Sequence, residues 1–129
     1  MDKVDNLREW IVENIPNEDR LYMRIHKNYF RQGKVAPGVF REKGGGMSTD
    51  WCKYSTPEMT RARARIPSDN GVLSLPVGEV RGIPGLSVIH TPDIENGNRA
   101  HTDVKGITCE RKTEIRVHLL RLHRVEIPL

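Results

Sequence analysis

Three of the five histidines stand where a folded domain often places a functional site. His26 ends a predicted strand, two residues after Arg24. His90 ends a second predicted strand, and His101 opens a third. Because the loops at the ends of rigid strands commonly carry binding and catalytic groups, these positions are candidate site residues. If the three strands are neighbours, we expect these four side chains and that of Asn98 to converge on one cleft.

Two histidines and an arginine suit the cleavage of a phosphodiester. One imidazole takes a proton as general base, the other gives a proton as general acid, and the arginine offsets charge on the phosphoryl oxygens. The candidate catalytic residues are Arg24, His26, His90 and His101. The same imidazoles, together with Asp93 or Asp103, are ligand types that zinc or another divalent cation takes. A third interpretation makes each histidine a hydrogen-bonded structural residue at a strand end.

A second group of candidates consists of polar and aromatic residues near the predicted strands. Trp51 follows Asp50, and an aromatic side chain either packs in the core or carries binding energy at an interface. Asn98 and Asp103 flank His101 in the sequence. The candidate binding residues are therefore Asp50, Trp51, Asn98 and Asp103.

The sequence lacks the recognised catalytic signatures. It has no P-loop, GxGxxG, HExxH, paired CxxC or GxSxG pattern. The three glycines at 44–46 precede Met-Ser-Thr rather than Lys-Ser/Thr, which favours a flexible loop over a phosphate cradle. We therefore expect no cofactor, and we assign no metal-ligating residue.

The elements that would position these residues predict one α+β domain over residues 1–129, with a small mixed or antiparallel sheet. Apolar residues at helical spacing predict an N-terminal helix over 3–15, which Pro16 ends. Alternating apolar and polar residues over 20–27 predict a half-buried strand with Arg24 on its polar face. Thr56 and Pro57 predict the start of a helix that ends near residue 66. Further strands are expected near 47–54, 72–75, 86–90 and 100–104, and helical turns over 77–83.

Two segments are less regular. Residues 28–46 predict a long glycine-rich loop, with one short extended piece around 39–40. The segment 112–129 fits either a helix or a strand, because its apolar residues satisfy both periods. We favour a helix over 112–123 followed by an extended tail, so that one or two helices besides the N-terminal one pack on the sheet.

Composition restricts the class of protein. The chain has 129 residues, 36% of them hydrophobic, and no apolar run of about 18 residues that a membrane helix needs. No signal segment opens it, and two cysteines are too few for a disulfide scaffold. The net charge of +4 is mild and its basic residues are spread along the chain, which permits a nucleic-acid partner without requiring one. These features predict a soluble cytoplasmic domain that does not bind a membrane.

Five stretches of the sequence resemble a group of small uncharacterised bacterial proteins. They are LYMRIH at 21–26, MSTDW at 47–51, TPE at 56–58, the segment 71–81 and NRAHTDVKG at 98–106. The resemblance covers most of the chain from Arg20 onward. It implies a single self-contained bacterial domain and transfers no functional residue.

The function that these observations predict is that of a small cytoplasmic accessory or interaction domain. Such a domain acts through a protein partner, through a second copy of the chain, or through a nucleic acid. The alternative is a histidine-dependent phosphodiesterase or ribonuclease that uses the candidate catalytic residues above. A metal-binding domain is the further alternative.

Overall fold

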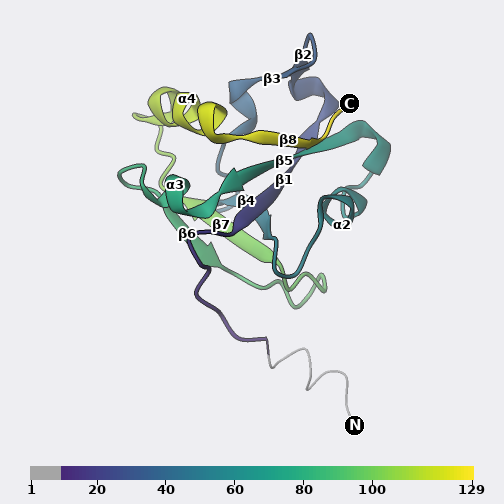
Figure 1. The fold of residues 1–129 in the computed structure, drawn as a ribbon, viewed down its shortest axis with the longest axis vertical. Coiled ribbons are helices and arrows are strands. Elements are labelled where there is room, and N and C mark those ends of the chain that lie inside the picture. Colours follow the sequence, from purple (N-terminus) through teal and green to yellow (C-terminus); the bar gives the residue numbers. More distant parts are fainter. Residues whose placement is uncertain (1–9) are drawn as a thin grey trace.

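A six-stranded antiparallel sheet dominates the computed structural model, which describes residues 10–129 (Figure 1). The strand order is β6-β7-β4-β1-β5-β8, and every neighbouring pair is antiparallel. In chain order the strands are β1 (Arg20–His26), β4 (Met47–Trp51), β5 (Asn70–Pro76), β6 (Ser87–His90), β7 (His101–Lys105) and β8 (Arg124–Ile127). The structure therefore confirms the α+β class and the antiparallel form of the sheet.

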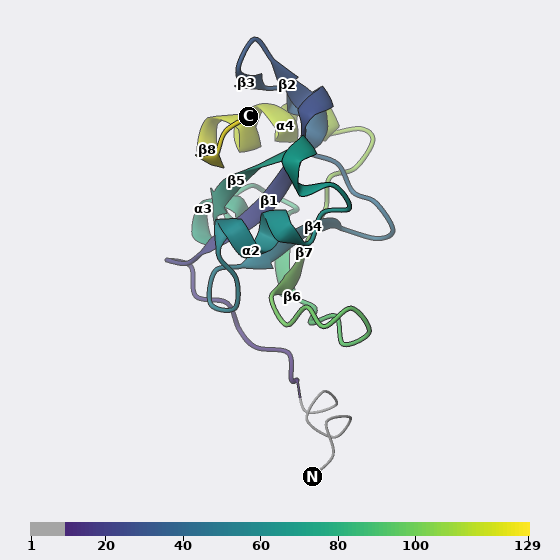
Figure 2. The ribbon, with the colours of Figure 1, turned by 90° about the vertical axis from the view of Figure 1, so that its right-hand side faces the viewer.

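Helices cover both faces of this sheet (Figures 1 and 2). The α-helices are α2 (Pro57–Ala62), α3 (Val77–Arg81) and α4 (Lys112–Leu122). Short 3-10 turns form η1 (Lys27–Tyr29), η2 (Pro37–Val39) and η3 (Pro67–Asp69), and a small separate hairpin consists of β2 (Phe30–Arg31) and β3 (Lys34–Val35). The helix α2 lies on the opposite side of β1 and β5 from α3 and α4. Within residues 10–129, no helix has both the length and the apolar character that crossing a bilayer requires.

Alternation along the central strands separates an apolar face from a polar face. In β1, Leu21, Met23 and Ile25 are buried in the hydrophobic core, to which α4 contributes its own apolar side chains. Tyr22 and Arg24 point to the other face, because successive side chains of a strand alternate. The confirmed strand thus turns a row of polar side chains toward α2.

Strand register extends this polar row across the sheet. Tyr22 is paired with Asp50 on β4, and Asp50 is paired with His101 on β7. Directly paired residues of an antiparallel ladder project on the same side. Three polar side chains from three strands are therefore brought to one surface by backbone pairing alone.

Several local signals act as the sequence predicts. The Thr56 hydroxyl accepts a hydrogen bond from the Met59 backbone N–H, with Pro57 in the first helical position, but α2 ends at Ala62 rather than near residue 66. The ambiguous C-terminal segment forms α4 followed by β8, as favoured. The long loop over 28–46 contains the hairpin and two 3-10 turns. Of the piece expected to be extended around 39–40, Val39 ends a 3-10 turn and Phe40 has extended backbone dihedrals. Phe40 enters the core there and is fully buried.

The predicted N-terminal helix is wrong over the part that the structure describes. Residues 3–9 lie outside the described range, and residues 10–15 contain no helix. The Glu13 backbone N–H donates to the His90 ring, and its carboxylate accepts from Lys53 Nζ at 2.7 Å and from the Tyr54 hydroxyl. Ile15 is buried in the core. These contacts with distant residues replace the local hydrogen bonds of a helix, so tertiary structure overrides the helical period.

Acid should weaken the Glu13 contact. Hydrogen bonds from Lys53 and Tyr54 hold the pKa of Glu13 below its ordinary value, and a lowered carboxyl pKa adds stability that is present above the unfolded pKa. That stability is lost as the pH falls through the folded pKa. We expect Glu13→Gln to lower the urea midpoint near neutral pH, and the difference from wild type to shrink as the pH falls through the folded pKa of Glu13.

Urea unfolding across this pH range measures the effect. Glu110→Gln, which changes an exposed carboxyl, is the matched control. A wild-type minus Glu13→Gln difference that stays constant down to the acidic end would contradict the proposed titration.

Candidate functional site

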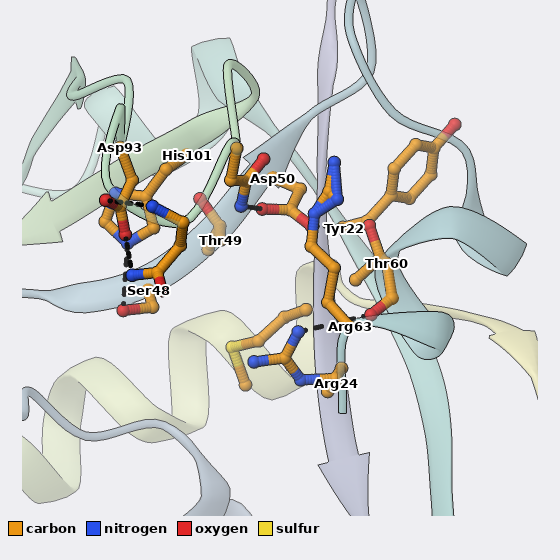
Figure 3. A pocket seen from close by; sticks show the side chains of 12 residues that line it. Tyr22, Arg24, Ser48, Thr49, Asp50, Thr60, Arg63, Asp93 and His101 are labelled. Atoms are coloured by element: carbon orange, nitrogen blue, oxygen red, sulfur yellow. Dashed lines mark hydrogen bonds and ion pairs between the residues drawn. The ribbon is translucent and has the colours of Figure 1, made fainter. Parts of the chain in front are cut away.

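An open pocket of about 580 Å³ lies on the polar face of the sheet (Figure 3). Its volume falls in the range of small-molecule sites. The strands β1, β4 and β7, the helix α2 with the residue that follows it, and the segment between β6 and β7 all contribute to its walls. The lining residues are Tyr22, Met23, Arg24, Ser48, Thr49, Asp50, Thr60, Arg63, Asp93, Asn96, Asn98 and His101.

A buried carboxylate forms the floor of the pocket. Asp50 is 4% exposed, and its Oδ1 accepts a hydrogen bond from Asn98 Nδ2 at 2.8 Å. Its Oδ2 accepts from the Thr60 hydroxyl at 2.8 Å. The Thr60 oxygen in turn lies 2.9 Å from the Ser55 hydroxyl. One side chain of β4 therefore joins α2 and the β6–β7 segment to the sheet.

His101 and Ser48 form a close pair on the wall of the pocket. The His101 Nδ1 lies 3.0 Å from the Thr91 carbonyl oxygen and 2.9 Å from the Thr91 hydroxyl. Because a carbonyl only accepts, this contact favours the neutral tautomer that carries its proton on Nδ1. The free lone pair is then on Nε2, which lies 3.2 Å from the exposed Ser48 Oγ. A base held by a third group beside a hydroxyl is the geometry of an activated nucleophile.

Two guanidinium groups supply positive charge to the same pocket. Arg24 is exposed on β1, and its Nη1 donates to the Thr60 carbonyl at 3.2 Å. Arg63 follows α2, and its Nε lies 3.9 Å from Asp50 Oδ2. That Nε is buried, and residues 10–129 offer it no hydrogen-bond partner. Both guanidinium groups line the pocket, and the Arg63 side chain keeps 27% of its surface exposed, so the pair can attract an anionic oxygen.

A short turn forms the rim beside His101. The Asn96 side chain donates to Asp93 Oδ2 at 2.8 Å, and the Asn96 backbone N–H donates to Oδ1. The hydrogen bond from the Asn96 side chain, and to a lesser degree the nearby His101, lowers the pKa of Asp93. Asp93 is consequently an anion at neutral pH, so it can attract the cationic form of the imidazole but cannot donate a proton.

The structure does not bring the three predicted imidazoles together. His90 is 1% exposed, with Nδ1 accepting from the Glu13 N–H at 3.0 Å and Nε2 donating to the Arg99 carbonyl at 2.7 Å. Its ring packs between Trp51 and Tyr54 in the core. The expectation that His90 reaches a cleft is therefore wrong, because its register on β6 turns it to the apolar face.

His26 also lies outside the pocket. Its Nδ1 accepts from the Asn28 N–H at 3.1 Å and so caps η1. Of the four candidate catalytic residues, only Arg24 and His101 line the pocket. We expected one arginine and three imidazoles to converge on one cleft, and the structure brings together one arginine and one imidazole.

The candidate binding residues divide equally. Asp50 and Asn98 lie in the pocket and contact each other. Trp51 is 1% exposed in the core, where its Nε1 donates to Asp19 Oδ2 at 2.9 Å. Asp103 is paired with Ser48 on the polar face but does not line the pocket.

Two chemically important residues of the pocket, Ser48 and Arg63, are not among the candidates predicted from the sequence. Ser48 shares the polar face with Asp50 because the two are separated by one residue on β4, and that alternation was a usable signal. Arg63 carries no comparable signal, since it enters the pocket only because α2 ends one residue earlier.

The structure offers little for a metal ion. Among residues 10–129, no group of three His, Cys, Asp or Glu side chains is placed to hold one. The imidazole that lines the pocket already uses Nδ1 toward Thr91. The metal-binding interpretation therefore has no ligand set in the described part of the chain.

Removing the Asp50 carboxylate should destabilise the whole molecule. In Asp50→Ala, the Asn98 amide and the Thr60 hydroxyl lose their buried acceptor, at a cost of about 1–3 kcal/mol for each abandoned group. Asp50→Asn keeps one acceptor oxygen and should lose less. Asp93→Ala, at the half-exposed rim, is the control and should cost under about 1 kcal/mol.

Urea unfolding of the three variants measures these free energies. Equal stability of Asp50→Ala and wild type would show that the buried carboxylate does not hold these elements together.

No protein-family model matches the chain, and neither the curated proteins nor the solved structures contain a match. The resemblance to small bacterial proteins therefore stays a prediction, and the functional argument depends on the pocket itself.

Proposed function

We propose that the chain cleaves a phosphodiester bound in this pocket, with His101 as the general base. The observation that carries the proposal is the held imidazole: Thr91 fixes the ring, and Nε2 faces an open pocket that also contains Arg24 and Arg63. This is the histidine-dependent alternative that the sequence suggests, with one imidazole in place of two. His101 lies on a strand of the sheet, and a rigid element holds a catalytic side chain in place better than a loop does.

The charges of the pocket suit a phosphate group. A phosphodiester carries one negative charge, which rises on the equatorial oxygens during displacement. Arginine forks match pairs of phosphate oxygens, and both Arg24 and Arg63 line the pocket. Arg24 at the exposed edge and Arg63 at the floor are therefore suited to hold the substrate and to offset charge in the transition state.

The amide and carboxylate groups add hydrogen-bonding capacity around this centre. Asn96 and Asp93 stand at the rim beside the imidazole. Amide and carboxylate groups recognise the edges of nucleobases. A single-stranded nucleic acid, RNA above all, is therefore the proposed substrate class. The broader expectation of an accessory domain with a protein partner, and its cytoplasmic location, stay predictions.

Loss of the imidazole should abolish cleavage without unfolding the chain. We expect His101→Gln to lower kcat by about 100-fold or more, the usual contribution of a positioned general base. The assays are release of 4-nitrophenol from bis(4-nitrophenyl) phosphate and cleavage of a fluorogenic single-stranded RNA. His118→Gln, an exposed histidine on α4, is the matched control.

The unfolding midpoint of each variant shows whether it is folded. A folded His101→Gln variant with wild-type rates, or a wild-type chain that cleaves neither substrate, would refute the proposed function.

Arg24 should act chiefly on substrate binding. Because its guanidinium lies at the exposed edge of the pocket, we expect Arg24→Gln to raise KM and to lower kcat/KM by about 10-fold or more, the loss of one charge-assisted contact. Arg121→Gln on α4 serves as the control for net charge. Steady-state kinetics at two salt concentrations separate the loss of a direct contact with the substrate from the general effect of a lower net charge. An unchanged KM would remove Arg24 from the binding site.

A further inference from the structure

We propose that Ser48 is the nucleophile of this site and that the reaction passes through a covalent phosphoserine diester. The inference rests on the proposed function and deepens it, because a general base can also activate water or a hydroxyl of the substrate. The pocket contains features that favour the serine over both.

The first feature is the placement of the two side chains. Ser48 and His101 lie on neighbouring strands, since β4 is paired with β7. In that ladder His101 is opposite Asp50, so Ser48 is its diagonal neighbour on the same face. Both residues belong to the central part of the sheet, which fixes the 3.2 Å separation of Oγ and Nε2 without help from a mobile loop.

The second feature is the direction in which the base points. In the tautomer that the Thr91 carbonyl favours, the lone pair of the ring is on Nε2. This nitrogen lies beside the Ser48 hydroxyl (Figure 3). The Thr91 carbonyl, the imidazole and the Ser48 hydroxyl lie in sequence, so Nε2 can accept the serine proton. A water molecule or a substrate hydroxyl would have to displace Ser48 from that acceptor.

The third feature is the state of the other hydroxyl groups that line the pocket. Thr60 donates to the buried Asp50 carboxylate, and Thr49 donates to the Thr102 carbonyl at 2.9 Å. Burial raises the pKa of the Tyr22 phenol, which makes its anion harder to form. Ser48 is exposed, and within the described pocket it is the hydroxyl that lies beside an imidazole nitrogen.

Cleavage through Ser48 takes two successive displacements at phosphorus. The Ser48 proton moves to His101 Nε2 while Oγ forms a bond to phosphorus and the bond from phosphorus to the leaving oxygen breaks. The leaving oxygen takes a proton from water at the open mouth of the pocket. A second water then attacks phosphorus, and the Oγ–P bond breaks. The proton on Nε2 returns to the Ser48 oxygen, and a proton of the attacking water is released to solvent.

A fluorophosphonate probe tests the nucleophile independently of the natural substrate. The probe forms an Oγ–P bond and loses fluoride, a leaving group that needs no proton. We expect intact and peptide mass spectrometry to place the adduct on Ser48. Labelling should fall by about 100-fold in His101→Gln and should be absent in Ser48→Ala. Ser68→Ala, which changes an exposed serine on η3, should label as wild type does.

Cleavage assays then separate the two proposals. A serine nucleophile predicts that a single-stranded DNA and an RNA of the same sequence are both cleaved, because no 2′-hydroxyl is needed. Ser48→Ala should lose both activities. If Ser48→Ala still cleaves and His101→Gln does not, the serine inference fails and the proposed function stands. If Ser48 is labelled but no phosphodiester is cleaved, the proposed substrate class fails and the nucleophile stands. Absence of any adduct on Ser48 overturns the inference.

Discussion

The pocket depends on one buried carboxylate. Asp50 lies on β4 with 4% of its surface exposed, and its two oxygens accept hydrogen bonds from Thr60 and Asn98, which belong to other parts of the fold. A buried anion is tolerated only when such donors and nearby positive charge compensate for lost hydration. Asn98, Thr60 and Arg63 provide that compensation. The segments that carry them are thereby held around one point of the sheet.

The two faces of the sheet have different roles: one packs in the hydrophobic core and the other lines the pocket. On one face, side chains of β1 and β5 pack with α4 into the hydrophobic core, which gives the strands their rigidity. On the other face, the same strands present polar groups at spacings that the backbone ladder fixes. The pairing of β4 with β7 sets the relative positions of His101 and Ser48. The end of α2 sets the position of Arg63.

Local sequence was informative wherever one element decides the outcome. Alternation in β1 predicts that Arg24 is on a polar face, and Thr56 with Pro57 predicts the start of α2. The fate of each histidine was not decided locally. His90 and His101 are both followed by threonine, yet pairing of His90 with Thr102 turns it to the core, whereas pairing of His101 with Asp50 turns it to the pocket. Register between distant strands carries that difference, and no window of sequence contains it.

The N-terminal segment shows the same limit. Its apolar period is helical, but Glu13 makes better contacts with Lys53, Tyr54 and His90 than a free helix would offer. Short helices are marginal on their own, so a few long-range contacts are enough to displace them. Prediction from local sequence therefore fails where contacts with distant parts of the chain determine the conformation.

The alternation on β4 also constrains how such a site can change over generations. Ser48 and Asp50 face the pocket while Met47 and Trp51 face the core. Substitutions at the pocket-facing positions can vary the ligand while the apolar interior is untouched. A one-residue insertion or deletion would invert every side chain beyond it and exchange the two surfaces. New specificities in this scaffold should therefore arise by point substitution, with length variation confined to the segments between strands.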